Sequence, residues 1–209
     1  MKITIIGASR GIGNELLRIS LDEGHEVTAL LRNPAKLNIS NSRLKIVVGD
    51  VLDPATVATA VVGNDAVCLC IGIPPTRKPV DVFSRGAECV LSAMGPGTSS
   101  KLITVTGIGA GDSKGHGGFF YDRVINPLLL GTIYADKDRQ ESIVKASKVE
   151  WLIVRPGFLT NGPLTGKYRV IENLSGVTAG KISRADVADF MLKQLATPTY
   201  FGKTPLLTY

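Results

Sequence analysis

The amino-acid sequence predicts an α/β fold in which helices cover both faces of a single, doubly wound parallel sheet. Three observations support this prediction. Short runs rich in Val, Ile and Leu alternate with helical stretches along the chain, a glycine-rich turn follows the first of these runs, and 209 residues suit one domain with a sizeable core.

The expected strands are of one type, because the first five are compact apolar runs of five or six residues, as strands buried on both faces should be. The six expected strands are Lys2–Ile6, Glu26–Leu31, Leu44–Val48, Asp65–Cys70, Lys101–Thr106 and Glu150–Val154. Helices are expected at Gly11–Glu23, Pro54–Val62, Val80–Met94, Ala135–Ser147 and Arg184–Ala196. The last helix begins with a capping pattern, since Ser183 precedes it and Asp186 stands three residues later. The alternation predicts parallel strands joined by right-handed crossovers.

The stretch 107–131 interrupts this alternation. It is rich in glycine, contains Phe119, Phe120 and Tyr121, and is too long for a plain connection. We therefore expect a binding loop or lid here. Together with residues 158–180 it is expected to form a small substrate region within one domain that spans residues 1–209.

Composition narrows the partners. The net charge of +6 favours an anionic ligand or substrate, although it also serves solubility, and no Lys/Arg block points to nucleic acid. Apolar runs are shorter than the roughly 20 residues that cross a bilayer, and a strand starting at Lys2 leaves no room for a signal peptide. Three cysteines suggest no disulfide framework, which favours a cytoplasmic protein. With only His25 and His116, no metal site is expected.

The glycine turn reads Gly7-Ala8-Ser9-Arg10-Gly11-Ile12-Gly13 and joins the first strand to the first helix. This context is typical of dinucleotide binding, because glycines let the backbone approach a pyrophosphate at a helix N-terminus. A plain strand-to-helix connection is the alternative. The expected cofactor contacts in the turn are Gly7, Ser9, Arg10, Gly11, Ile12 and Gly13.

The end of the second strand predicts which dinucleotide is bound. NAD-binding domains usually place a carboxylate there, whereas this chain has Arg32 and Lys36, and Arg10 lies in the turn. We expect Arg10 and Arg32 to bracket the adenosine 2′-phosphate, because guanidinium groups bind phosphate bidentately. NADP is therefore favoured over NAD; exposed surface arginines are the alternative.

Later strand ends continue this cofactor track. Asp50 is expected to accept a hydrogen bond from the adenine amino group, with Val51 beneath the ring, although Asp after a strand is often only a turn residue. Ile71 and Gly72 would let the backbone pass close to the ribose.

With these motifs the chain resembles the short-chain dehydrogenase/reductase superfamily, and more narrowly its biliverdin-IXβ reductase/flavin reductase family. The narrower resemblance rests on several stretches in order: Leu31-Arg32, Val47-Val48-Gly49-Asp50-Val51-Leu52, Ser84-Arg85-Gly86-Ala87, Pro163-Leu164-Thr165-Gly166-Lys167-Tyr168, Ile182-Ser183-Arg184-Ala185-Asp186 and Phe190-Met191-Leu192. It implies a monomeric Rossmann-type domain, NADPH as cofactor, and reduction of flavins or linear tetrapyrroles. It also implies that the backbone of Pro156, Gly157 and Phe158 holds the nicotinamide amide.

The chain departs from the superfamily's catalytic residues. Gly107 stands where a serine is usual, and Lys137 has Ile133 four residues before it instead of tyrosine. Tyr134 is off by one, which rotates it by about 100° around a helix. The tyrosine acid is therefore expected to be missing, unless Tyr121 or Tyr134 reaches in.

An enzyme without that acid suits planar conjugated acceptors, for which catalysis is mostly positioning. The catalytic candidates are Thr106 and Lys137. The alternatives are that Thr106 is only a capped strand end, and that Lys137 pairs with Glu141 on an exposed helix face. The expected substrate contacts are His116, Phe119, Phe120, Tyr121 and Tyr168, with Phe158 as a further stacking candidate. Loop anchoring is the alternative for the aromatic pairs, and a solvated side chain for His116.

The sequence thus predicts an NADPH-dependent reductase of a flavin such as FMN or riboflavin, a biliverdin-like tetrapyrrole, or a quinone. A non-enzymatic, NADP-binding redox sensor of the NmrA-like type is the alternative. A carbonyl reductase or epimerase is disfavoured by the absent Tyr-xxx-Lys pattern. A monomer is expected, with a dimer left open.

Overall fold

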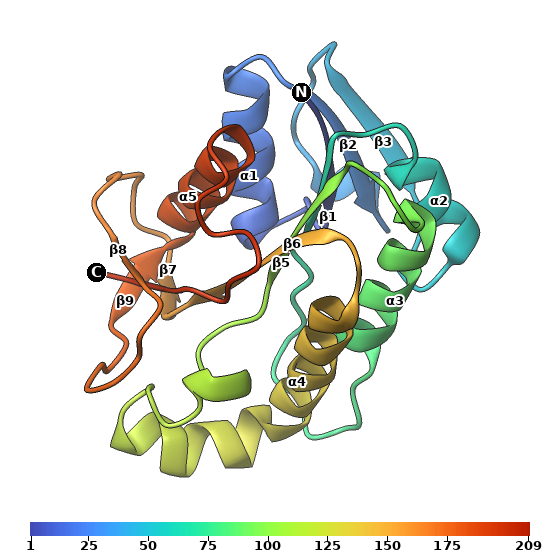
Figure 1. Cartoon of the computed structure of the whole chain (residues 1–209). Helices are drawn as coiled ribbons and strands as arrows, with labels where there is room; N and C mark the ends of the chain where they lie inside the picture. Colours follow the sequence, from blue (N-terminus) through green and yellow to red (C-terminus); the bar gives the residue numbers. More distant parts are fainter.

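The computed structural model of the protein describes residues 1–209. Its ten strands are β1 (Lys2–Ile6), β2 (Glu26–Leu31), β3 (Leu44–Val48), β4 (Ala66–Leu69), β5 (Lys101–Val105), β6 (Glu150–Pro156), β7 (Phe158–Thr160), β8 (Arg169–Ile171), β9 (Lys181–Ser183) and β10 (Leu206–Thr208). Eight of them form the central sheet in the order β3-β2-β1-β4-β5-β6-β10-β8 (Figure 1). The first six strands pair in parallel, which confirms the predicted doubly wound sheet.

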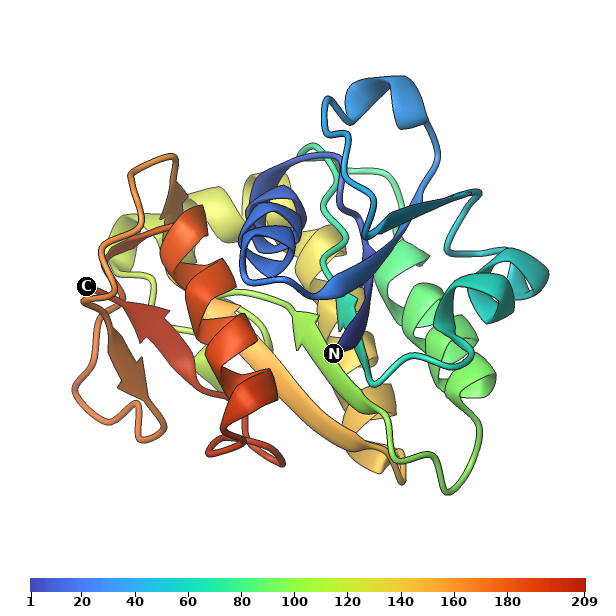
Figure 2. The ribbon, with the colours of Figure 1, turned by 90° about the horizontal axis from the view of Figure 1, so that it is seen from above.

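Helices cover both faces of this sheet (Figure 2). α1 (Gly11–Asp22) and α5 (Arg184–Ala196) pack against each other on one face, and α2 (Pro54–Val61), α3 (Val82–Met94) and α4 (Gly131–Ala146) cover the other. Successive side chains of β1 supply opposite cores, since Ile5 packs with α1 and α5 while Ile6 packs with α2 and α3. No helix is both long and apolar enough to cross a membrane.

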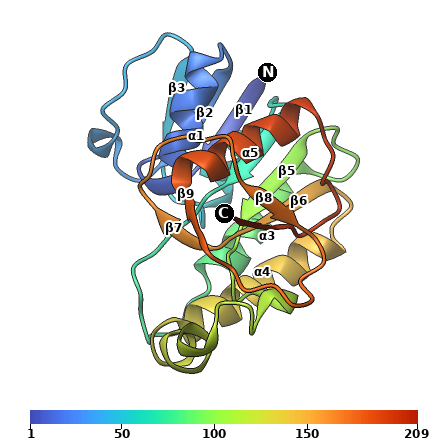
Figure 3. The same cartoon turned by 90° about the vertical axis from the view of Figure 1, so that its left-hand side faces the viewer.

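The carboxyl-terminal part extends the sheet beyond the six predicted strands. β10 pairs in parallel with β6, and β8 pairs antiparallel with β10, while β7 and β9 form a separate parallel pair close to α5 (Figure 3). The prediction of an all-parallel sheet was therefore incomplete. These strands are three residues long, which is too short for a periodic pattern to stand out from the sequence.

The stretch 107–131 is not a plain loop. Residues Tyr121–Leu130 form a π-helical segment, η3, which runs directly into α4 and projects from the domain (yellow-green in Figure 1). Pro127 lies inside it and has no N–H to donate to a preceding turn, so a wider hydrogen-bonding pattern is accommodated there.

The two segments expected to form the substrate region do meet in the structure. Tyr121 of η3 packs edge-on against Phe158, with ring centroids 5.0 Å apart. The His116 ring Nδ1 lies 2.8 Å from the carbonyl oxygen of Val177, and the Ala179 amide donates to the His116 carbonyl. The region is thus one packed unit beside the end of the sheet.

Candidate functional site

The three glycines of the turn have different surroundings. A Cβ added at Gly7 would lie 2.6 Å from the carbonyl oxygen of Cys70, and one at Gly13 would lie 2.5 Å from the carbonyl oxygen of Gly7. Both glycines therefore allow close packing of α1 on β1 and β4. At Gly11, which has a φ of +63°, a Cβ would meet nothing closer than the side chain of Arg184 at 3.8 Å. Gly11 is thus the glycine whose open face can admit a phosphate.

The amino end of α1 is built for an anion. No acidic residue stands in its first turn, and Arg10 at the N-cap position makes no side-chain hydrogen bond to the first amides of the helix. The first-turn N–H groups therefore remain available, and the helix dipole favours negative charge there. Ser9 is half-buried next to them, whereas the buried Ile12 side chain belongs to the core, so Ile12 can contribute only its backbone. These residues fit the diphosphate of a dinucleotide.

The two arginines expected to bracket the 2′-phosphate have different partners. Arg10 donates to the carbonyl oxygen of Gly72 at 3.3 Å, whereas Arg32 at the end of β2 lies 4.0 Å from the Asp50 carboxylate. The Arg32 side chain is 80% exposed, and such an open ion pair is weak. Lys36 is also exposed on the following 3₁₀ turn, η1 (Pro34–Lys36). Arg32 and Lys36 thus remain candidates for the 2′-phosphate, while Arg10 joins the glycine turn to the segment that follows β4.

Some of the side chains that follow β3 and β4 pack in the interior. Val51 is buried. A Cβ added at Gly86 would lie 3.2 Å from the Val51 side chain and 3.1 Å from the Ile71 side chain. The Val51 side chain fills the space left by Gly86 of α3, and its position beneath an adenine ring stays a prediction. Asp50 accepts a hydrogen bond from the Leu52 amide, as a turn residue does, and its carboxylate stays partly exposed.

The backbone groups of residues 156–158, which the resemblance places at the nicotinamide amide, already have hydrogen-bond partners. The Gly157 amide donates to the Leu207 carbonyl and the Phe158 amide to the Gly180 carbonyl, both at 2.9 Å. The Pro156 carbonyl accepts from the Ile108 amide at 3.1 Å. The backbone N–H groups at Gly157 and Phe158 are thus used by β10 and by the approach to β9, and are not free to hold a nicotinamide amide.

The two catalytic candidates, Thr106 and Lys137, lie together. The Thr106 hydroxyl is buried and donates to Glu141 Oε1 at 2.8 Å, so it is not free to act on a substrate. Its carbonyl oxygen accepts a hydrogen bond from Lys137 Nζ. The alternative pairing of Lys137 with Glu141 on an exposed helix face was wrong, because Glu141 is buried and bonded elsewhere. Burial lowers the pKa of Lys137 to about 8.

The phenol of Tyr134 also reaches this point. A Cβ added at Gly107 would lie 3.1 Å from the Tyr134 hydroxyl and 3.8 Å from Lys137 Nζ. The exception left open for Tyr134 therefore applies, because residues three apart on a helix share a face much as residues four apart do. Tyr121 lies behind it, with the two hydroxyls 3.0 Å apart. Burial raises the pKa of the Tyr134 phenol, which keeps it protonated.

A buried ion pair that was not predicted supports these groups. Arg155 of β6 is fully buried and bonds Glu141 bidentately, with Nε–Oε1 at 2.9 Å and Nη2–Oε2 at 2.6 Å. Burial alone would raise the pKa of Glu141, but the hydrogen bonds and charge of Arg155 outweigh it and hold that pKa below its usual value. An arginine within an apolar strand signals such a partner, since a buried charge requires one.

The aromatic substrate candidates divide into two groups. Phe119 and Phe120 are 80% and 65% exposed, so they are not the loop anchors considered as the alternative. Tyr121 is buried, and the half-buried Tyr168 packs edge-on against Phe190 while donating to Asp189 at 2.7 Å, so neither ring is free to stack on a substrate. His116 is half-buried, and its Nδ1 joins its loop to the Val177 carbonyl oxygen at 2.8 Å.

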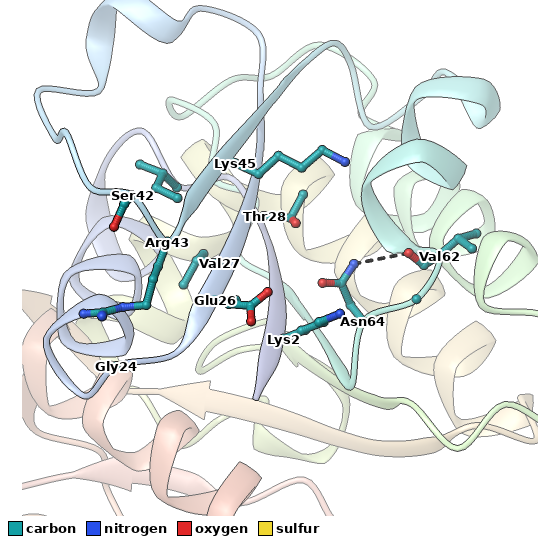
Figure 4. A pocket seen from close by; sticks show the side chains of 12 residues that line it. Lys2, Gly24, Glu26, Val27, Thr28, Ser42, Arg43, Lys45, Val62 and Asn64 are labelled. Carbon is teal, nitrogen blue, oxygen red and sulfur yellow. Dashed lines mark hydrogen bonds between the residues drawn. The ribbon is translucent and has the colours of Figure 1, made fainter.

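A second hollow lies away from this site. It has a volume of about 580 Å³ and is lined by polar side chains at the amino ends of the strands, among them Lys2, Glu26, Arg43, Lys45 and Asn64 (Figure 4). In open α/β sheets ligands bind outside the carboxyl ends of the strands, so the glycine-turn side is the candidate site.

Comparisons with known proteins agree with this geometry. A family model described as NAD(P)H-binding matches residues 7–198. The uncharacterized protein YwnB of Bacillus subtilis is 28% identical over 217 residues, which cover 96% of this chain and 94% of YwnB. The solved structure of ChuY, described as an anaerobillin reductase from Escherichia coli O157:H7, has a TM-score of 0.82 at 23% identity and covers 100% of this chain and 97% of ChuY. A short-chain dehydrogenase/reductase from Veillonella parvula, solved with NADP, has a TM-score of 0.82 at 16% identity over 100% of this chain and 94% of its own.

Proposed function

Because the chain belongs to the NAD(P)H-binding family, we propose that it is an NADPH-dependent reductase of a planar conjugated acceptor, a flavin such as FMN or a biliverdin-like tetrapyrrole. One observation carries the proposal. The cationic, open glycine turn and the convergence of Tyr134 and Lys137 on Gly107 both lie at the carboxyl ends of the parallel strands. ChuY, with the same fold, is described as a reductase of this chemical kind.

The turn and the basic residues hold the cofactor. The amides at Gly11 and the start of α1 face the diphosphate, and Arg32 and Lys36 face the 2′-phosphate that distinguishes NADPH from NADH. NADPH supplies the hydride when it is bound.

The residues around Gly107 hold a proton for the reduced acceptor. Reduction of the acceptor requires one proton for each hydride, and the Tyr134 hydroxyl holds one at the end of β5. The single proton of the Tyr121 hydroxyl has two acceptors within reach, the Tyr134 oxygen at 3.0 Å and the Ile108 carbonyl oxygen at 3.2 Å. When it is donated to Tyr134, the Tyr134 proton is free to point toward a bound acceptor. Lys137 places a positive charge next to this phenol, with Nζ 5.4 Å from its ring centroid.

The position of Tyr134 also favours a second candidate function, carbonyl reduction. A carbonyl acceptor becomes a strongly basic alkoxide and needs a proton donor, whereas a flavin spreads the negative charge over its ring. The absence of a tyrosine acid was the sequence-based argument against carbonyl substrates, and the structure removes that argument.

The test compares acceptors and one substitution. NADPH absorbance is followed with FMN, biliverdin, a quinone or an aldehyde, using wild type, Tyr134→Phe and the matched control Tyr168→Phe. We expect turnover of a planar acceptor that Tyr134→Phe lowers by less than about tenfold, whereas a carbonyl reductase would lose about 10²–10⁴-fold. If NADPH binds but no acceptor consumes it, the reductase proposal fails and a redox sensor is favoured.

A further inference from the structure

Arg184 brings a second positive charge to the glycine turn from the opposite end of the chain. It is the first residue of α5, and the preceding Ser183 caps that helix by accepting from the Asp186 amide at 2.9 Å. Its side chain lies over Gly11, with Nε 3.8 Å and Cδ 3.9 Å from the place where a Cβ of Gly11 would be. Packing of α5 on α1 holds the two helices together.

The guanidinium of Arg184 lacks an anionic partner. Its Nη1 donates to the side-chain oxygen of Asn161 at 2.7 Å, and no carboxylate lies within ion-pair distance. A guanidinium carries five N–H donors, so most of its donor capacity remains. A neutral partner also leaves the full positive charge uncompensated.

The electrostatics of this place are unfavourable without an anion. The N-terminus of a helix carries partial positive charge, and α1 has neither an acidic residue in its first turn nor a side-chain cap. Arg10 at the N-cap and Arg184 above Gly11 add two more positive charges. Such an arrangement is stabilised when a dianionic group sits between the amides and the guanidinium groups.

We propose that Arg184 is a ligand of the cofactor's diphosphate and contacts it from the α5 side. The turn then binds the diphosphate from one side through backbone amides, and Arg184 binds it from the other. Arg184 thereby acts on the part that NADPH and NADH share, unlike Arg32, which faces the 2′-phosphate. The inference rests on the dinucleotide site of the proposed function, and not on which acceptor is reduced.

The experiment measures binding without any acceptor. Dissociation constants are determined for NADPH, NADH, ADP and adenosine 2′-phosphate with wild type, Arg184→Gln, Arg184→Lys and Arg32→Ala. Arg18→Gln is the matched control, because it removes an exposed arginine of α1 that bonds only Asn14. Circular dichroism and the melting temperature confirm that each variant is folded.

We expect Arg184→Gln to weaken NADPH, NADH and ADP alike, by about ten- to a hundredfold, as the loss of hydrogen bonds to a charged group predicts. Arg184→Lys should fall in between, and adenosine 2′-phosphate should bind as before. Unchanged NADPH binding by folded Arg184→Gln overturns the proposal, as does an equal loss for adenosine 2′-phosphate. Absence of NADPH binding by wild type overturns both proposals, whereas binding without turnover overturns only the reductase.

Discussion

The glycine turn and the surroundings of Gly107 differ in how their polar groups are partnered. Around the glycine turn, Arg32 and Lys36 are exposed, and the first amides of α1 have no side-chain cap. Around Gly107, by contrast, Thr106, Lys137 and Glu141 are bonded to one another or to Arg155, and little of them meets solvent. The first region keeps its donors for a ligand, and the second uses most of its donors to fix one geometry.

This difference separates two kinds of function. Donors without partners at a helix N-terminus supply binding free energy when an anion arrives. A network whose members satisfy one another supplies little binding free energy, but it holds a proton donor in place, which is what positioning requires. Substitutions in the first region should therefore change affinity, and those in the second should change stability and turnover.

The largest effect is expected for Glu141→Leu. The substitution leaves Arg155 fully buried without its main partner, and breaking a buried ion pair in this way typically destabilises a protein by about 3–5 kcal/mol. The free energy of unfolding is measured in urea. The double variant Glu141→Leu/Arg155→Leu removes both charges and should recover much of the loss.

The Glu141–Arg155 ion pair also determines how the stability of the protein changes at acid pH. Because the pKa of Glu141 is lower in the folded state, its contribution to stability is present above its unfolded value, near 4.3, and is lost as pH falls through the folded value. Glu141→Leu should remove this part of the acid-induced loss. An unaltered acid limb in the variant would show that the ion pair does not couple to protons.

The next effect is on affinity alone. Arg32→Ala should weaken NADPH by about ten- to a hundredfold, because a charge-assisted contact with the 2′-phosphate contributes about 1.5–3 kcal/mol. NADH should bind almost unchanged, and so should the melting temperature, since the Arg32 side chain is 80% exposed. Equal losses for both cofactors would place the 2′-phosphate elsewhere, and Lys36→Ala then becomes the variant to test.

The glycine turn allows stability and binding to be separated within one motif. Gly13→Ala puts a methyl group 2.5 Å from the backbone oxygen of Gly7, and such overpacking typically destabilises by about 1–3 kcal/mol. Gly11→Ala meets no close atom but strains a φ of +63° by about 1 kcal/mol, and its methyl group occupies the open face. Urea unfolding should therefore rank Gly13→Ala as the less stable variant, and NADPH titration should rank Gly11→Ala as the weaker binder.

The strand, turn and helix of the first region could be predicted from the sequence because their determinants are local. A strand, a glycine turn and a helix follow one another within about twenty residues, and each step obeys short-range backbone rules. The parallel pairing of the first six strands follows from the same alternation.

The second region depends on pairs that are distant in the chain. Lys137 bonds the carbonyl of Thr106, 31 residues away, and Gly157 gives its amide to Leu207. Nothing in the sequence around Pro156–Phe158 shows that β10 takes these donors, because β10 is three residues long and follows α5. Arg155 was the available signal, since a charge in an apolar strand requires a buried acid.

The smallest expected change in stability concerns the exposed aromatic pair Phe119 and Phe120, which directly precedes η3. Phe119→Ser/Phe120→Ser should alter the free energy of unfolding by less than about 0.5 kcal/mol, because both rings are largely solvated. If they stack on a planar acceptor, the acceptor KM should rise while NADPH affinity stays constant. Leu164→Ser, at a comparably exposed apolar residue in the carboxyl-terminal part, is the control. An unchanged KM would assign acceptor contact to the groups around Gly107 alone.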